Sequence, residues 1–224
     1  NLSYISFEDV TFSFDSSIDN LFQNINLSFD KFSFIGLIGE SGSGKSTFIN
    51  ILIGLIKPNH GSVYNQNDNI FELEVKWFAK IGYVPQDAYL IDDSIRKNIA
   101  FGIDSNEIND EQVLHAAKQS NLLDFIEKQE SGLDTIIGEN ATKISGGQKQ
   151  RLAIARALYN DPEILVFDEA TSALDLNTEK EIMNEILMLR KNKTIFFSSH
   201  KPGSLMEADR VLEFKNQSII DIQK

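Results

Sequence analysis

A short glycine-rich pattern constrains the fold of this chain more than any other feature. Residues 39–46 read Gly-Glu-Ser-Gly-Ser-Gly-Lys-Ser, in which two glycines bracket four residues and Lys-Ser follows. A nearly continuous apolar run, residues 34–38, precedes the pattern, and apolar residues at helical spacing follow it over residues 48–56. The sequence therefore predicts a strand, a phosphate-binding loop and a helix in that order.

Each residue type in this loop suits the binding of a nucleotide's phosphates. Glycines let backbone N–H groups wrap around phosphate oxygens, and the start of a helix adds its positive end. Lys45 can reach the β and γ phosphates, and the hydroxyl of Ser46 can ligate Mg²⁺. The alternative is an ordinary glycine-rich turn without a ligand. The predicted nucleotide-binding residues of this loop are Gly39, Glu40, Ser41, Gly42, Ser43, Gly44, Lys45, Ser46 and Thr47.

Two later apolar runs also end in polar residues. Residues 164–167 read Ile-Leu-Val-Phe and lead into Asp168 and Glu169, while residues 194–199 lead into His200. In open α/β sheets, ligands bind at the carboxyl ends of the strands. We therefore expect these polar residues to converge with the phosphate loop on one site.

The adjacent carboxylates Asp168 and Glu169 would suffer desolvation at the end of a buried strand unless a cation or solvent lies nearby. A bound Mg²⁺ supplies that partner. Asp168 is then the carboxylate on the metal, and Glu169 is free to polarise an attacking water. The alternative is a plain acidic pair at a helix start.

The rest of the chain contains strand-like and helix-like sequence patterns. A first strand is expected over residues 2–14. Apolar residues alternate with polar ones at Ile5 and Phe7, at Val10, Phe12 and Phe14, and later at Ile25, Leu27 and Phe29, which is typical of half-buried antiparallel strands. Residues 87–160 are helical in texture, with Val113, Leu114, Ala117, Leu122, Leu123, Phe125 and Ile126 as core-facing candidates. A further helix is predicted over residues 178–190, with a capping box at Thr178.

These segments predict an α/β fold with a P-loop NTPase core and a mixed sheet, an N-terminal antiparallel β subdomain and an inserted α-helical subdomain. We expect a single domain, 1–224. Residues 1–86 and 161–224 would form the β subdomain and core, and residues 87–160 the helical subdomain.

Composition excludes several classes of function. The 21 Lys and Arg against 33 Asp and Glu give a net charge of -12, which repels nucleic acid. The absence of cysteine excludes disulfides and thiolate metal sites. The longest apolar stretch, residues 49–56, is too short to cross a bilayer. Because strand-like sequence begins almost at Asn1, we expect a domain cut from a longer protein.

Residues 144–148 form a second anion-binding pattern. Ser145, Gly146, Gly147 and Gln148 stand at the start of a helix-like run, where backbone N–H groups favour an anion, although a simple helix cap is the alternative. The segment resembles the signature of ATP-binding cassette proteins, with Ile144 in place of the usual Leu.

The resemblance to this family extends over essentially the whole chain. It implies that Gln86 lies near Mg²⁺ and the attacking water, that Asp175 lies across a dimer contact, and that His200 lies near the γ phosphate. Phe14 matches the family's adenine-stacking aromatic, although it shares a predicted strand face with Phe12 and could instead be core. His60, in a predicted turn, and His115, in a helix, are expected to be structural or solvated.

The segment over residues 90–102, together with residues 134–139, is similar to exporter cassettes. Gly138 and Glu139 resemble the start of an exporter loop that contacts the transmembrane domain, whereas Asn140 and Ala141 depart from its usual Arg-Gly. Among exporters, residues 40–44 and 85–93 resemble the corresponding segments of lipid-linked oligosaccharide flippases.

The resemblance thus implies a Mg²⁺-dependent ATPase that drives an exporter at the cytoplasmic face of a membrane. Its implied partners are a second cassette and a transmembrane domain, which is either fused upstream or a separate subunit. Nucleic acid is not among the implied partners. The alternative is a soluble cassette ATPase. DNA-maintenance members carry a long coiled coil between phosphate loop and signature, and translation factors usually carry two cassettes, whereas this chain shows neither. A regulatory module without turnover would conflict with Glu169 and His200.

Overall fold

The computed structural model describes residues 4–14, 20–138, 144–215 and 218–223. Its first sheet is antiparallel and has the strand order β2-β1-β4-β5. In it, β1 pairs with β2 on one side and with β4 on the other. The strands are β1 (Ile5–Phe12), β2 (Phe22–Phe29), β4 (His60–Asn65) and β5 (Asp68–Asn69). This sheet is the predicted N-terminal antiparallel β structure.

The second sheet is mixed and has the order β10-β9-β3-β8-β7-β6. The pairs β9–β3, β3–β8, β8–β7 and β7–β6 are parallel, and only β10 runs antiparallel to its neighbour. Its strands are β3 (Phe34–Gly39), β6 (Ile81–Val84), β7 (Ile164–Asp168), β8 (Thr194–Ser198), β9 (Arg210–Lys215) and β10 (Ser218–Gln223). The three strands predicted to end in polar residues, β3, β8 and β7, are direct neighbours.

Both faces of the central strands are buried, which explains their continuous apolar runs. One set of side chains packs against the antiparallel sheet and α1 (Lys45–Leu52), and includes Ile35, Leu37, Val166 and Phe196. The alternate set packs against α7 (Gly146–Leu158) and α8 (Leu176–Leu189), and includes Phe34, Leu165, Phe167 and Phe197. Both sets are fully buried.

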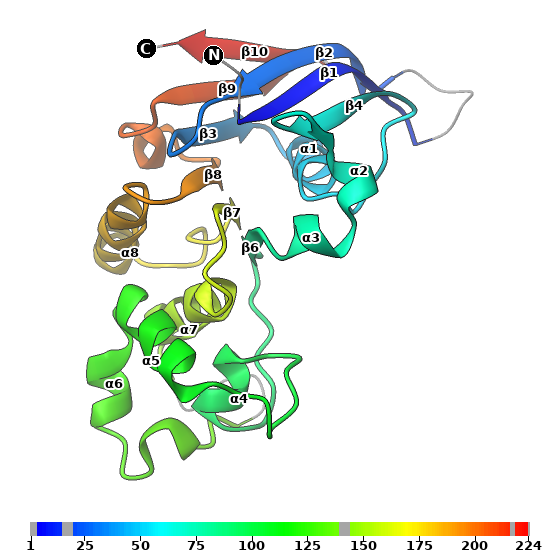
Figure 1. The fold of residues 1–224 in the computed structure, drawn as a ribbon. Coiled ribbons are helices and arrows are strands. Elements are labelled where there is room, and N and C mark those ends of the chain that lie inside the picture. Colours follow the sequence, from blue (N-terminus) through cyan, green and yellow to red (C-terminus); the bar gives the residue numbers. More distant parts are fainter. Residues whose placement is uncertain (1–3, 15–19, 139–143, 216–217, 224) are drawn as a thin grey trace.

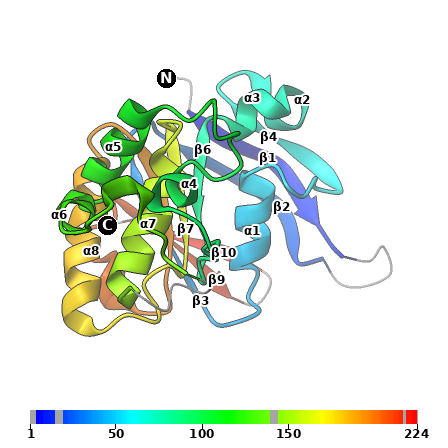
Figure 2. The same cartoon turned by 90° about the horizontal axis from the view of Figure 1, so that it is seen from below.

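Most of the shorter helices gather at one end of the molecule. In Figure 1, α5 and α6 lie at the end remote from β1, β2 and β10, and Figure 2 shows α4, α5, α6 and α7 together from below. These helices are α4 (Ile95–Ile99), α5 (Asp110–Gln119), α6 (Leu123–Glu127) and the 3₁₀ turn η1 (Gly132–Asp134). Two further short helices, α2 (Ile70–Leu73) and α3 (Val75–Phe78), and the turn η3 (Pro202–Leu205) lie elsewhere in the chain. The assignment of residues 87–160 to a separate subdomain stays a prediction.

Several predicted details are wrong. Helix α8 begins at Leu176 with Asp175 as its N-cap, not at Thr178, because the Asp175 carboxylate accepts from the N–H groups of Asn177 and Thr178. Leu114 is exposed, and Ala116 takes the core position instead. Strand β1 is shorter than the predicted residues 2–14, and His60 begins β4 instead of lying in a turn.

Within the described residues, no helix combines the length and apolar character needed to cross a bilayer. The predicted exporter loop falls largely on residues 139–143, which lie outside the described part of the chain; only Gly138 of that prediction is included.

Candidate nucleotide-binding site

The phosphate loop runs from the end of β3 to the start of α1. Gly42 and Gly44 adopt φ values of 79° and 106°, a region that side-chain-bearing residues rarely occupy. At Gly39, a Cβ atom would lie only 2.6 Å from the carbonyl oxygen of Phe214 on the neighbouring strand β9. The glycines are therefore required by the backbone path and by close packing.

Lys45 begins α1 and points back into this loop. Its side chain is only 4% exposed, and its Nζ donates to the carbonyl oxygens of Gly39 and Glu40 at 2.7 and 3.1 Å. The same Nζ lies 3.7 Å from Oε1 of Glu169. The ammonium group is thus held at the centre of the loop, where phosphate oxygens would replace carbonyl partners with anionic ones.

His200 follows β8 and contacts residues at the ends of two other strands, β7 and β3. Its Nε2 lies 2.6 Å from Oε1 of Glu169, and its Nδ1 lies 3.1 Å from the carbonyl oxygen of Gly39. The expected convergence of His200, Glu169 and the phosphate loop is confirmed, because one carboxylate oxygen faces both Lys45 and His200.

Glu169 occupies a backbone conformation that is unusual for its residue type, with φ at 52°. Its N–H donates to the carbonyl oxygen of Ser198, and its own carbonyl accepts from the N–H of Ser172. These bonds hold the carboxylate at the sheet edge despite the strain, a pattern that is typical of functional positions.

Asp168 is a partly buried carboxylate beside a second carboxylate. Burial, followed by the adjacent Glu169 carboxylate, raises its pKa, while hydrogen bonds from Tyr83 and Ser46 and the charge of Lys45 oppose the shift. The Tyr83 hydroxyl donates to Oδ2 at 3.4 Å, and burial and then Asp168 raise the pKa of Tyr83 to about 12. Lys45 and His200 face the Glu169 carboxylate, whereas Asp168 accepts from the uncharged hydroxyls of Tyr83 and Ser46.

These oxygen donors suit Mg²⁺, which binds through one or two carboxylates and retains waters and substrate phosphates as ligands. In the described residues, no three His, Cys, Asp or Glu side chains gather into a complete protein cage. Ser46 and Gln86 line one pocket and Ser46 is hydrogen-bonded to Asp168, so the oxygen donors of the predicted set fit a Mg²⁺ ion with phosphates as further ligands.

A pocket of about 560 Å³ brings most of the predicted residues together. It joins the loop to Gln86, Glu169 and His200, and it extends to Phe14. Ser172, which belongs to the family-like segment that ends at Asp175, lines the same pocket, as does Leu21, which no sequence pattern singled out. The predicted residues that line it are Phe14, Ser41, Gly42, Gly44, Lys45, Ser46, Thr47, Gln86, Glu169 and His200.

Phe14 lies beyond the end of β1 and is 73% exposed, whereas Phe12 is buried. The two rings meet edge to face with centroids 5.0 Å apart. The interpretation of Phe14 as a core residue is therefore wrong, and its exposed ring is available to a flat ligand.

The signature segment is not part of this pocket. Ser145 caps α7, accepting from the N–H of Gln148 at 3.2 Å, while Oε1 of Gln148 accepts from the N–H of Ser145 at 2.9 Å. Ser145 and Gly146 are exposed, and neither Gly147 nor Gln148 lines the pocket of the phosphate loop. The predicted helix cap is thus real, and the segment lies outside the pocket of the phosphate loop.

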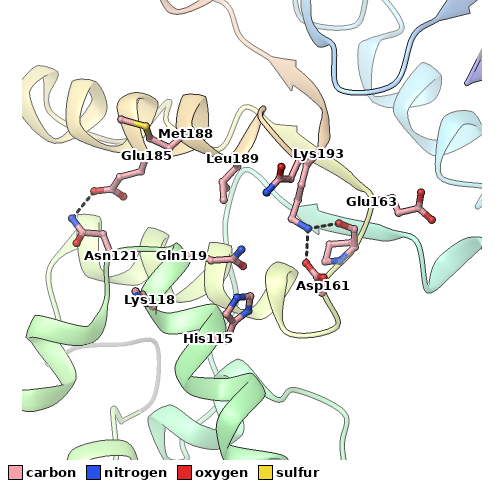
Figure 3. A pocket seen from close by; sticks show the side chains of 12 residues that line it. His115, Lys118, Gln119, Asn121, Asp161, Glu163, Glu185, Met188, Leu189 and Lys193 are labelled. Carbon is pink, nitrogen blue, oxygen red and sulfur yellow. Dashed lines mark hydrogen bonds and ion pairs between the residues drawn. The ribbon is translucent and has the colours of Figure 1, made fainter.

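A larger cavity, of about 780 Å³, lies at the opposite edge of the sheet, where residues 161–163 precede β7 and Lys193 precedes β8. Figure 3 shows that several of its polar groups already face partners: Lys193 donates to Asp161 and to the carbonyl of Pro162, and Asn121 donates to Glu185. It lacks the glycine loop and the paired carboxylates, so the smaller pocket is the candidate site.

Comparisons with known proteins agree with this geometry. The family model described as ABC transporter matches residues 22–172. The chain is 39% identical over 97% of its length to the ATP-dependent lipid A-core flippase of Idiomarina loihiensis, covering 37% of that protein. It is 37% identical over 97% to the leukotoxin translocation ATP-binding protein LktB of Mannheimia haemolytica, covering 31%.

A solved structure described as a bacterial Atm1-family ABC exporter with ATP bound shares the fold with a TM-score of 0.83 and 33% identity, over 97% of this chain and 37% of that one. The chain therefore spans about a third of the length of these relatives. With a family model matched across most of its length and this site geometry, the chain belongs to the ABC transporter family.

Proposed function

We propose that this chain binds and hydrolyses ATP with Mg²⁺ and serves as the motor domain of an exporter. The observation that carries the proposal is the convergence of Lys45, Glu169 and His200 on one oxygen-lined pocket at the phosphate loop. The names of similar proteins, an ATP-dependent flippase and a translocation ATP-binding protein, support the same assignment.

Each residue has a separate task in this proposal. Backbone N–H groups of the loop and the Lys45 ammonium bind the β and γ phosphates, and the Phe14 ring stacks on adenine. Ser46, Asp168 and Gln86 would hold Mg²⁺, which neutralises phosphate charge when bound. Glu169 accepts a proton from the attacking water, and His200 orients Glu169 and faces the γ phosphate.

The exposed signature segment supports a site shared between two copies. The Ser145 hydroxyl accepts one hydrogen bond in its cap, so its own proton is free to donate to a phosphate oxygen. We assign Ser145, Gly146, Gly147 and Gln148 to the nucleotide held by a partner's phosphate loop. Asp175, which caps α8, would lie at the same contact.

The remaining partner is a transmembrane domain, fused to this chain or separate, which places the chain at the cytoplasmic face of a membrane. The cargo is a separate question: relatives named for lipid A-core and for a toxin are 39% and 37% identical to this chain. Because these two identities are nearly the same, they favour neither a lipid nor a protein as the cargo. The resemblance to lipid-linked oligosaccharide flippases stays a prediction.

A direct test measures phosphate release from ATP by the purified chain with and without Mg²⁺. We expect Mg²⁺-dependent turnover, and a loss of nucleotide affinity in Lys45→Ala because the lost ammonium compensates phosphate charge in the ground state as well. Calorimetry separates the two effects. Turnover without Mg²⁺, or unchanged affinity in the variant, would contradict the proposed site.

A further inference from the structure

Glu179 lies in the first turn of α8, outside the nucleotide pocket, and has an environment that is unusual for a surface helix. Its side chain is only 8% exposed, and both of its carboxylate oxygens accept hydrogen bonds. Oε2 accepts from Nζ of Lys201 at 2.7 Å, while Oε1 accepts from the hydroxyls of Thr171 and Ser204 at 3.2 and 3.1 Å. A buried carboxylate is retained at low cost only when it is satisfied in this way.

The three donors come from the two loops that carry the catalytic residues. Thr171 lies two residues after Glu169 in the loop that follows β7, and Lys201 directly follows His200 after β8. The loops already touch at their roots, where the N–H of Glu169 donates to Ser198. Glu179 connects the two loops a second time, and it is held in the first turn of α8, which Asp175 caps.

This arrangement bears on the 2.6 Å contact between Nε2 of His200 and Oε1 of Glu169. The His200 ring is 42% exposed, and within the described part of the chain its polar contacts are to Glu169 and Gly39, so packing alone constrains the ring weakly. Its backbone neighbour Lys201, by contrast, is tied to Glu179. The position of the ring therefore depends on that tie.

We propose that Glu179 is a positioning residue for hydrolysis: through Lys201 and Thr171 it holds His200 and Glu169 in register at the phosphate loop. The inference rests on the proposed ATPase function. Glu179 itself contacts neither nucleotide nor water in the pocket and acts only through the loops that it joins.

The substitution Glu179→Gln tests the tie selectively. The amide oxygen can still accept from Thr171 and Ser204, but an amide N–H₂ faces the ammonium of Lys201 and cannot accept from it. Lys201→Met breaks the same tie from the other side. A matched control is Glu163→Gln, because Glu163 also accepts from a lysine, Lys31 at 3.0 Å, and from a hydroxyl, Tyr4 at 3.0 Å, but lies at the opposite end of β7.

Two readouts separate positioning from a general loss of structure. The chain has three histidines, His60, His115 and His200, so their ring signals in an NMR spectrum are few, and the His200 signal is assigned by its loss in His200→Ala. In Glu179→Gln and in Lys201→Met we expect the His200 signal alone to shift. We also expect kcat to fall about tenfold, as for a misplaced catalytic group, with KM changed less than about twofold.

Glu163→Gln should change neither the His200 signal nor kcat. An unshifted His200 signal in Glu179→Gln, or an equal loss of kcat in Glu163→Gln, would overturn the inference. If the wild-type chain fails to hydrolyse ATP, the proposed function falls, whereas the NMR comparison still decides whether Glu179 positions His200.

Discussion

At the scale of single residues, Asp168 shows a conflict between stability and function. Burial and the neighbouring Glu169 raise its pKa, so the charged form that a metal requires is disfavoured in the metal-free fold. A group whose pKa is raised on folding destabilises the fold at pH values above its unfolded pKa, and this cost disappears as the pH falls.

We therefore expect Asp168→Asn to raise the Tm of the nucleotide-free chain at neutral pH, because the amide removes the charge that burial and Glu169 disfavour. The advantage should shrink as the pH is lowered and Asp168 itself takes up a proton. Thermal melts at two pH values measure both effects. A variant that melts below the wild type at neutral pH would contradict the electrostatic account.

Phe14 provides a second test at this scale. The ring is 73% exposed, so Phe14→Ala should leave the melting temperature nearly unchanged. A lost stacking contact is worth about 0.5 to 1.5 kcal/mol, which corresponds to a several-fold to about tenfold loss of ATP affinity. Phe14→Tyr should bind at least as well, as calorimetry would show. Unchanged affinity in Phe14→Ala would place adenine elsewhere.

The residues of the phosphate loop and the strand ends could be predicted because motif and topology act together: glycine spacing fixes the loop, and parallel strands bring their carboxyl ends to one edge. The contacts of Tyr83 with Asp168 and of Glu179 with Lys201 could not be predicted in this way. These contacts span 85 and 22 positions of sequence, and no local pattern specifies them.

At the scale of elements, α7 and α8 are joined at two levels. Near their starts, a Cβ on Gly147 would lie 2.7 Å from Cγ2 of Thr178, so the helices approach closely there. Further along, Arg151 donates from Nε and Nη2 to the Glu185 carboxylate, and burial leaves both side chains less than a fifth exposed. The helix that carries the signature is thus attached to the helix that Asp175 caps.

Removing one charge of this pair leaves the other uncompensated. Arg151→Met should therefore cost about 2 kcal/mol of unfolding free energy, and the double variant Arg151→Met with Glu185→Leu should recover part of it. Lys31→Met, which breaks a pair with both side chains about two-fifths exposed, should cost less than about 1 kcal/mol. Urea unfolding measures all of these, and equal losses in Arg151→Met and Lys31→Met would refute the distinction.

Element boundaries were harder to predict than element types. The capping-box pattern at Thr178 competed with Asp175, and the aspartate caps the helix because its carboxylate reaches two free N–H groups. The short helices α2 and α3 had no detectable period, since four residues complete barely one turn. The conformation of α2 and α3 depends on the packing of Ile70 and Trp77 into the core, which only the three-dimensional structure shows.

At the scale of the whole molecule, the chain presents two segments that we propose bind phosphate, and they do not meet within one chain. The loop of residues 39–46 lines the pocket, whereas Ser145 and Gly146 lie exposed at the start of α7. With a net charge of -12, two copies repel each other unless nucleotide and metal bridge them. Association should therefore depend on ATP.

Light scattering on Glu169→Gln with and without Mg²⁺ and ATP tests this shared site most directly. The amide keeps the shape of the side chain but cannot accept the water's proton, so ATP should bind and persist. We predict the mass of one chain without ATP and of two chains with it, and a monomer under both conditions when Ser145→Arg is added, although that variant still binds ATP. A nucleotide-independent monomer, or a dimer that survives Ser145→Arg, would contradict the account.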